Sequence, residues 1–151
     1  MFYRKKFLHD AAHRTVSHIR TAAEGELPSD FAALRLLAMR RYDLDVQAIR
    51  RGGFTAELVQ DFAPGDECSP YGGEWTVYYN AGAGEETRLR YLVHELAEYL
   101  AICDLPTLFD GLPGTETYHY HGGDNPADVR HRIAFYTEHL YVKSIKSKPS
   151  P

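Results

Sequence analysis

One short segment of the sequence combines residue types that bind metals and activate water. Residues 92–100 read L-V-H-E-L-A-E-Y-L, with His94 and Glu98 four positions apart and Glu95 between them. If the segment is helical, the side chains of His94 and Glu98 lie on one face, with Cβ atoms about 5–6 Å apart. Zinc binds imidazole nitrogen and carboxylate oxygen, and a nearby glutamate can deprotonate a water molecule. The spacing therefore indicates a metal site with His94 and Glu98 as ligands and Glu95 as general base.

The same spacing also suits an ordinary amphipathic helix, whose solvent-facing side often carries glutamates. We expect His94, Glu95 and Glu98 near the edge of the buried stripe, because burying a carboxylate without a partner is costly. A bound cation and simple contact with solvent both satisfy that expectation, so spacing alone leaves the two interpretations open. The apolar residues that form the stripe are Leu89, Leu92, Val93, Leu96, Ala97, Leu100 and Ala101.

Further histidines lie elsewhere in the chain. Tyr118, His119 and His121 precede the last predicted helix. The two histidines could bind a metal, or one of the three side chains could stabilise an oxyanion. The alternative is that these residues belong to a polar surface loop. His9 and His13 are four apart in the first predicted helix, but they lack a glutamate companion. We therefore expect His9 and His13 to be exposed.

Bulk properties narrow the class of protein. The chain has 151 residues, a formal net charge of -4 and a pI of about 6.0, so the overall charge gives no support to nucleic-acid binding. The N-terminus lacks the apolar run of a signal peptide, and no stretch approaches the roughly 20 apolar residues of a membrane span. The two cysteines, Cys68 and Cys103, are too few for a disulfide framework. We expect a soluble protein of the cytoplasm with reduced thiols.

The elements around the motif are predicted from periodicity and turn residues. Apolar spacing predicts four helices and alternation predicts three strands, whereas Ser29 or Asp30 is expected to cap the second helix. We expect one α+β domain over residues 1–146, a small, mostly antiparallel sheet packed with about four helices, and a frayed tail over 147–151. The motif helix follows the last strand. The predicted helices are 7–24, 30–41, 85–103 and 126–146, the strands are 43–49, 54–62 and 74–80, and residues 104–125 form a loop.

Three segments resemble the metallopeptidase domain of the ImmA/IrrE family. They are L-P-S-D-F-A-A-L at 27–34, W-T-V-Y-Y-N at 75–80, and T-R-L-R-Y-L-V-H-E-L-A-E-Y-L at 87–100. The likeness spans roughly residues 9–142, and its most specific part is the block that joins the strand to the helix. The resemblance implies a minimal zincin-like fold, whose helix carries H-E-x-x-H and whose following helix supplies a glutamate as third zinc ligand.

The sequence departs from the family pattern at two positions. The second histidine of the family motif is Glu98 here, and the last helix, V-R-H-R-I-A-F-Y-T-E-H-L, has His131 where the family has an acidic residue. The two departures are consistent with one reciprocal exchange that keeps ligand number, ligand types and charge. The resemblance then implies a metal held by His94, Glu98 and His131, with zinc expected and manganese or iron as alternatives. Glu138 and His139 are expected at the surface or around the site.

The resemblance implies a metal-dependent endopeptidase. Glu95 would be the general base, Tyr118, His119 or His121 would steady the oxyanion, and the peptide would lie along the edge of strand 74–80. The substrate would be a separate repressor of helix-turn-helix type, cleaved under stress or in a mobile element. One alternative is an inactive scaffold that binds a peptide or repressor without cleavage, and another is a structural protein without metal. The presence of Glu95 favours the enzyme, because a binding scaffold does not need a general base.

Overall fold

The computed structural model describes residues 2–49, 56–61, 74–103, 108–113 and 126–147, and the structural statements below concern these residues. The chain is of the α+β class, as predicted, with helices and a three-stranded mixed sheet. The helices are α1 (Phe2–Ala22), α2 (Phe31–Arg41), α3 (Glu85–Cys103) and α6 (Pro126–Lys146), and the strands are β1 (Asp45–Ile49), β2 (Ala56–Asp61) and β3 (Glu74–Asn80).

Helix α1 begins at Phe2 rather than Phe7, because nothing in F-Y-R-K-K interrupts a helix. It ends before Gly25, whose φ of 107° is in the left-handed region and whose N–H donates to the carbonyl of Arg20 at 2.9 Å. Glycine adopts this conformation without a steric penalty and commonly terminates helices in this way. The buried face of α1 has helical spacing and comprises Phe7, Leu8, Ala11, Ala12, Thr15, Val16 and Ile19.

The start of α2 is tied to the start of α3. The Asp30 side chain caps α2 by accepting a hydrogen bond from the N–H of Ala33 at 2.8 Å, so of the two expected caps it is Asp30 that acts. Glu85, in the first turn of α3, accepts from the N–H of Phe31 at 2.7 Å. Glu85 also pairs with Arg88, and the Arg88 guanidinium lies over the Phe31 ring. These contacts fix the N-terminal end of the helix that carries the motif.

The sheet has the order β1-β3-β2. Strand β3 pairs in parallel with β1 and antiparallel with β2, so the sheet is mixed rather than mostly antiparallel. Strand β3 is therefore central, and the expectation that its edge receives a peptide is wrong, because both its edges are already hydrogen-bonded to neighbours. The edge strands are β1 and β2, and Leu58 of β2 lies opposite Val77 of β3 on the core side.

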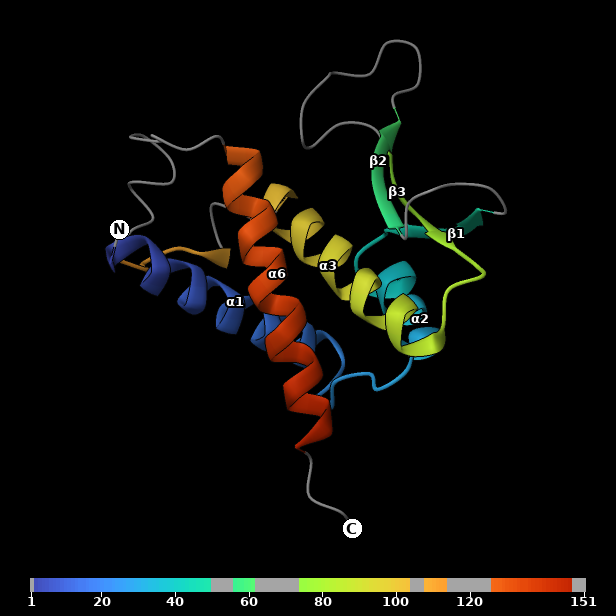
Figure 1. Cartoon of the computed structure of the whole chain (residues 1–151), viewed down its shortest axis with the longest axis horizontal. Helices are drawn as coiled ribbons and strands as arrows, with labels where there is room; N and C mark the ends of the chain where they lie inside the picture. Colours follow the sequence, from blue (N-terminus) through green and yellow to red (C-terminus); the bar gives the residue numbers. More distant parts are fainter. Residues whose placement is uncertain (1, 50–55, 62–73, 104–107, 114–125, 148–151) are drawn as a thin grey trace.

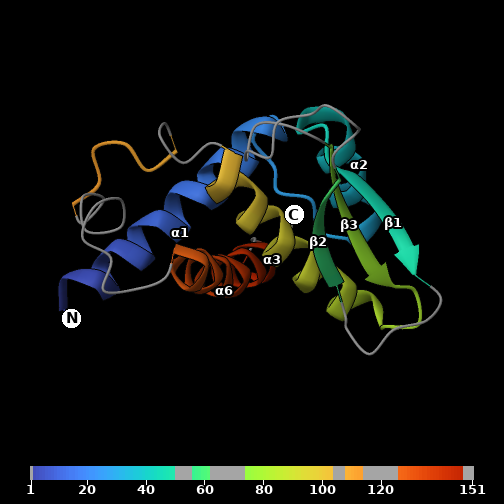
Figure 2. The same cartoon turned by 90° about the horizontal axis from the view of Figure 1, so that it is seen from above.

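Helix α3 is the central element of the fold. It contacts α6 and α2, and also β2 and β3, so that it lies between the helical layer and the sheet. Figure 1 shows α6 crossing over α1 and α3, and Figure 2 shows the sheet at the opposite side of α3 from these helices. The core is formed around this helix by fully buried residues such as Leu92, Leu96, Leu100, Ile133 and Val77. The position of α3 explains why its polar residues are enclosed by other elements.

The long helices of the described part of the chain have one buried and one exposed face. None of them is both long and apolar enough to cross a membrane. Helix α6 shows the pattern: its buried residues include Ile133, Ala134 and Tyr141, whereas Phe135 and His139 are exposed. The Tyr141 hydroxyl donates to the carbonyl of Pro28 and so links α6 to the segment before α2.

Candidate metal centre

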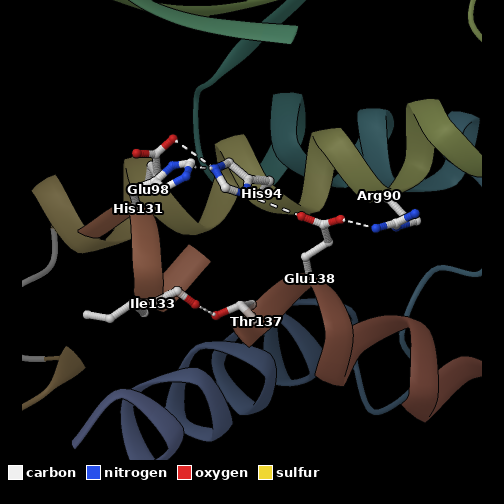
Figure 3. A network of polar contacts seen from close by, with 7 residues as sticks. All are labelled: Arg90, His94, Glu98, His131, Ile133, Thr137 and Glu138. Carbon is white, nitrogen blue, oxygen red and sulfur yellow. Dashed lines mark hydrogen bonds and ion pairs between the residues drawn. The ribbon is translucent and has the colours of Figure 1, made fainter. Parts of the chain in front are cut away.

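Two side chains, those of Glu98 and His131, converge on one nitrogen atom of His94. Nε2 of His94 lies 3.3 Å from Oε2 of Glu98, one turn later on α3, and 3.2 Å from Nδ1 of His131 on α6. One ligand atom from each residue lies within 4.8 Å of those of the other two. Figure 3 shows the three side chains meeting between the two helices. The structure therefore brings together the three residues predicted as metal ligands.

Two of the three distances between these atoms suit a tetrahedral metal site. With metal–ligand bonds of about 2.0–2.1 Å, neighbouring ligand atoms of a tetrahedron are about 3.3 Å apart. The two separations from Nε2 of His94 agree with that spacing. Two imidazoles and a carboxylate are also donors that zinc accepts, and three protein ligands leave a fourth position for water or substrate. His131 is exposed, so the group is open to solvent on the side of α6.

The hydrogen-bonding pattern of His94 suits a positive charge at Nε2. A neutral imidazole has one N–H and one bare nitrogen. If Nδ1 donates to Glu138, 3.3 Å away, Nε2 turns its lone pair toward the Glu98 carboxylate. A cation at Nε2, a second proton on His94, or an N–H donated by Nδ1 of His131, 3.2 Å away, would compensate that lone pair. Burial lowers the pKa of His94, but hydrogen bonds to Glu138 and Glu98 and the charges of Glu98 and Glu95 raise it to about 9.

Glu98 is held in the ionised form that a metal ligand requires. Burial raises its pKa, but the hydrogen bond with His94 and the positive charges of His94 and His131 lower it below the usual range overall. A carboxylate that stays ionised at neutral pH can bind a cation without first losing a proton. The site therefore has one permanent negative charge that complements a metal ion.

Glu95 is more buried than the sequence suggested. His94 and Glu95 are only 6% and 8% exposed, and the expectation that they lie at the edge of the apolar stripe is wrong for both. Burial raises the pKa of Glu95, and the charge of Glu98, a hydrogen bond with Glu98 and the charge of Glu57 on β2 raise it further. The carboxyl group is thus close to a predicted ligand and to the edge strand β2. A positively charged ion at the centre would oppose this rise.

Glu138 also belongs to the group around His94. From the sequence it was expected either at the surface or around the site. Its side chain is 5% exposed, and its two oxygens contact Nδ1 of His94 and the guanidinium of Arg90. Burial raises its pKa, but the hydrogen bond from His94 and the charge of Arg90 lower it overall. The signal in the sequence is its spacing, because Glu138 follows His131 by seven residues and so lies on the same helix face.

The remaining predicted site residues divide into two groups. His9, His13 and His139 are exposed, as expected for the first two, and the ring of His139 contacts that of Phe135. The others lie outside the residues that the structure describes. They are Tyr118, His119 and His121. Cys68 and the tail residues 148–151, for which no site role was predicted, also lie outside the described residues.

The chain was compared with protein families, curated proteins and solved structures. No protein-family model, curated protein or solved structure matches the chain. The resemblance to ImmA/IrrE peptidases therefore stays a prediction from sequence motifs. The geometric basis for a function is the group of His94, Glu98 and His131, the one cluster in the described part of the chain that has the spacing of a metal site.

Proposed function

We propose that the chain is a metal-dependent endopeptidase, most simply a zinc enzyme related to the ImmA/IrrE type. The observation that carries the proposal is the convergence of Glu98 and His131 on Nε2 of His94, at separations that suit a tetrahedral ion. Two histidines and a carboxylate also suit iron, and manganese is a further candidate. Zinc is preferred because three ligands with an open position are typical of zinc hydrolases.

Glu95 is the candidate general base. It is buried beside the ligand group and hydrogen-bonded to Glu98, which places a carboxyl group next to one of the proposed metal ligands. A bound metal would supply Lewis acidity, polarising the peptide carbonyl and lowering the pKa of water. Glu95 would accept the proton of that water and return it to the leaving amine. Tyr118, His119 or His121 remains the proposed source of an oxyanion donor.

Strand β2 is the better edge for binding an extended peptide. It contacts α3, and its residue Glu57 lies close enough to influence Glu95. The opposite edge strand is obstructed: the N–H of Val46 is bonded to the Asp45 side chain and its carbonyl to Arg35, both at 3.0 Å. Alternate residues of an edge strand present their backbone groups outward. Because those of Val46 are already hydrogen-bonded, β1 has few backbone groups with which to bind a further strand. A peptide added to β2 would run beside the metal centre.

The substrate and setting follow from the resemblance. We propose a separate repressor of helix-turn-helix type as the substrate, whose cleavage would release expression of genes under stress or in a mobile element. A cytoplasmic location belongs to the same proposal, since such a repressor acts there. The alternative, a scaffold that binds the partner without cutting it, is separated from the enzyme by the experiment below.

Metal content tests the proposal first. The untagged chain is dialysed against a weak chelator and bound metals are quantified for the wild type, Glu98→Ala, His131→Ala and the control His139→Ala. We expect about one zinc per chain in the wild type and the control, and none in the other two variants. Cleavage of a denatured protein substrate by wild type but not by Glu95→Gln would identify the enzyme. Metal without any cleavage would favour the binding scaffold, and a wild type without metal would overturn the proposal.

A further inference from the structure

Glu138 is one of the most enclosed charged groups in the described part of the chain, and both of its oxygens are engaged. Oε2 lies 3.3 Å from Nδ1 of His94, and Oε1 lies 2.7 Å from the guanidinium of Arg90. The Glu138 side chain is 5% exposed, whereas that of Arg90 is 40% exposed. Figure 3 shows Glu138 between His94 and Arg90, on the side of His94 opposite to Glu98 and His131. The Glu138 carboxylate therefore joins the His94 imidazole to the partly exposed guanidinium of Arg90.

We propose that Glu138 is a positioning residue that fixes the tautomer and the ring orientation of His94, and that Arg90 holds Glu138 in place for this task. The inference rests on the proposed function, because it assigns a role within the metal centre. A histidine that binds a metal through one nitrogen usually donates its other N–H to a carboxylate or carbonyl group. With its proton on Nδ1 facing Glu138, His94 presents the lone pair of Nε2 toward Glu98 and His131.

The geometry argues against Glu138 as a metal ligand. Nδ1 and Nε2 lie on different sides of the imidazole ring, and Glu138 contacts Nδ1 whereas the other two residues face Nε2. Its second oxygen is held by Arg90. An ion pair of this length is a charge-assisted hydrogen bond, which is stronger than a neutral one. Arg90 thus keeps the carboxylate ionised and directed at His94.

The register of two helices produces this arrangement. Arg90, His94 and Glu98 are spaced four residues apart on α3, so they form one row along the helix face that meets α6. His131 and Glu138 are two turns apart on α6 and face the same row. Helix α3 therefore contributes two proposed ligands and Arg90, and α6 contributes one proposed ligand and Glu138. The ligand His94 is held from both ends of its ring by α6.

Zinc affinity of the full chain tests the role of Glu138. Affinity is measured by competition with a chromogenic chelator for the wild type, Glu138→Gln, Glu138→Met and the control Glu86→Gln. Glu86 pairs with Lys146 at 3.1 Å and thus also joins α3 to α6, but both side chains are exposed, and Glu86 lies eight residues before His94 on α3. We expect Glu138→Met to weaken zinc binding by about 10- to 100-fold. Glu138→Gln, which keeps a hydrogen-bond acceptor, should lose less, and Glu86→Gln should bind as the wild type.

Two further readouts separate positioning from a structural role. Long-range ¹H–¹⁵N spectra of the zinc-loaded protein should show His94 with its proton on Nδ1 in the wild type, and loss of this proton signal in Glu138→Met. The urea midpoint of the metal-free variants reports folding, and Glu138→Gln provides the test if Glu138→Met does not fold. Variants that fold and bind zinc with wild-type affinity would overturn the inference alone. A wild type that binds no zinc would overturn the proposed function and the inference with it.

Discussion

Glu98 and His131 lie on different helices, yet both face the same nitrogen of His94. The family that the sequence resembles has histidine at the first of these positions and an acidic residue at the second. In the structure, the two side chains are close enough for an exchange of residue types to leave the ligand set unchanged. Two imidazoles and one carboxylate give the same donors and the same charge in either arrangement.

This proximity predicts that the exchange can be reversed. We expect the double variant Glu98→His with His131→Glu to bind about one zinc per chain, because it restores the same three donors in opposite positions. The matched control Glu98→Ala with His131→Glu lacks one ligand and should hold no metal after dialysis. Metal analysis of the purified chains is the measurement. A double variant as empty as its control would show that each position requires its own ligand type.

The raised pKa of His94 predicts how the stability of the metal-free protein depends on pH. A folded-state pKa of about 9, above the ordinary 6.5, means that the folded chain holds this proton more tightly than the unfolded chain. The stabilisation is complete below about pH 6.5 and is lost as pH rises through about 9. We expect the contribution of His94 to the free energy of unfolding to fall over this window by about 3 kcal/mol. The raised pKa of Glu95 acts in the same direction.

Urea unfolding in chelator at closely spaced pH values measures this slope. The variant His94→Gln cannot take up the proton and should show a flatter profile between pH 6.5 and 9. A wild type whose stability rises across this window would contradict the expected sign.

At the scale of elements, sequence periodicity predicted the bounds of helices and strands, which depend on local patterns. The motif helix and the central strand have the predicted bounds, 85–103 and 74–80, because both patterns are strong and a glycine-containing turn separates them. The strand order could not be predicted, since alternation identifies a buried face but not the neighbouring strands. The role of Glu138 depends on how α6 crosses α3, which one helix pattern does not specify. The burial of His94 and Glu95 has the same origin, because α6 and β2 cover their helix.

The cap of α2 is a prediction that belongs to this scale. Asp30 accepts the N–H of Ala33, whereas the exposed Ser29 precedes the cap. We expect Asp30→Ala to lower the free energy of unfolding by about 1 kcal/mol, because one N–H of the first turn loses its acceptor. Ser29→Ala should change it by less than about 0.5 kcal/mol. Chemical denaturation of both variants makes the comparison, and equal effects would contradict the assignment of the cap.

At the scale of the whole molecule, the proposed metal centre joins two helices that are distant in sequence. The proposed ligands come from α3 and α6, so an ion bound to them would be held only by the folded chain. A ligand that binds only the native state stabilises it by mass action, by about 2.7 kcal/mol at a concentration of 100 times the Kd.

We therefore expect zinc at that concentration to raise the Tm by about 5–10 °C. The variant His131→Ala loses the contribution of α6 to the centre and should show a much smaller increase. Thermal unfolding followed by circular dichroism, with zinc and with chelator, measures the difference. An equal increase in both proteins would place the bound zinc elsewhere in the chain.

The obstructed edge of β1 has a consequence for self-association. An exposed sheet edge is a template on which further chains can add as strands. Propagation into a fibre requires two open edges, since each added molecule must offer another edge for the next. In the described part of the chain, Arg35 and Asp45 occupy the backbone groups of Val46 on one side. Pairing between two molecules through β2 would therefore end at a dimer. The side chains of Arg35 and Asp45 would prevent further molecules from adding at β1.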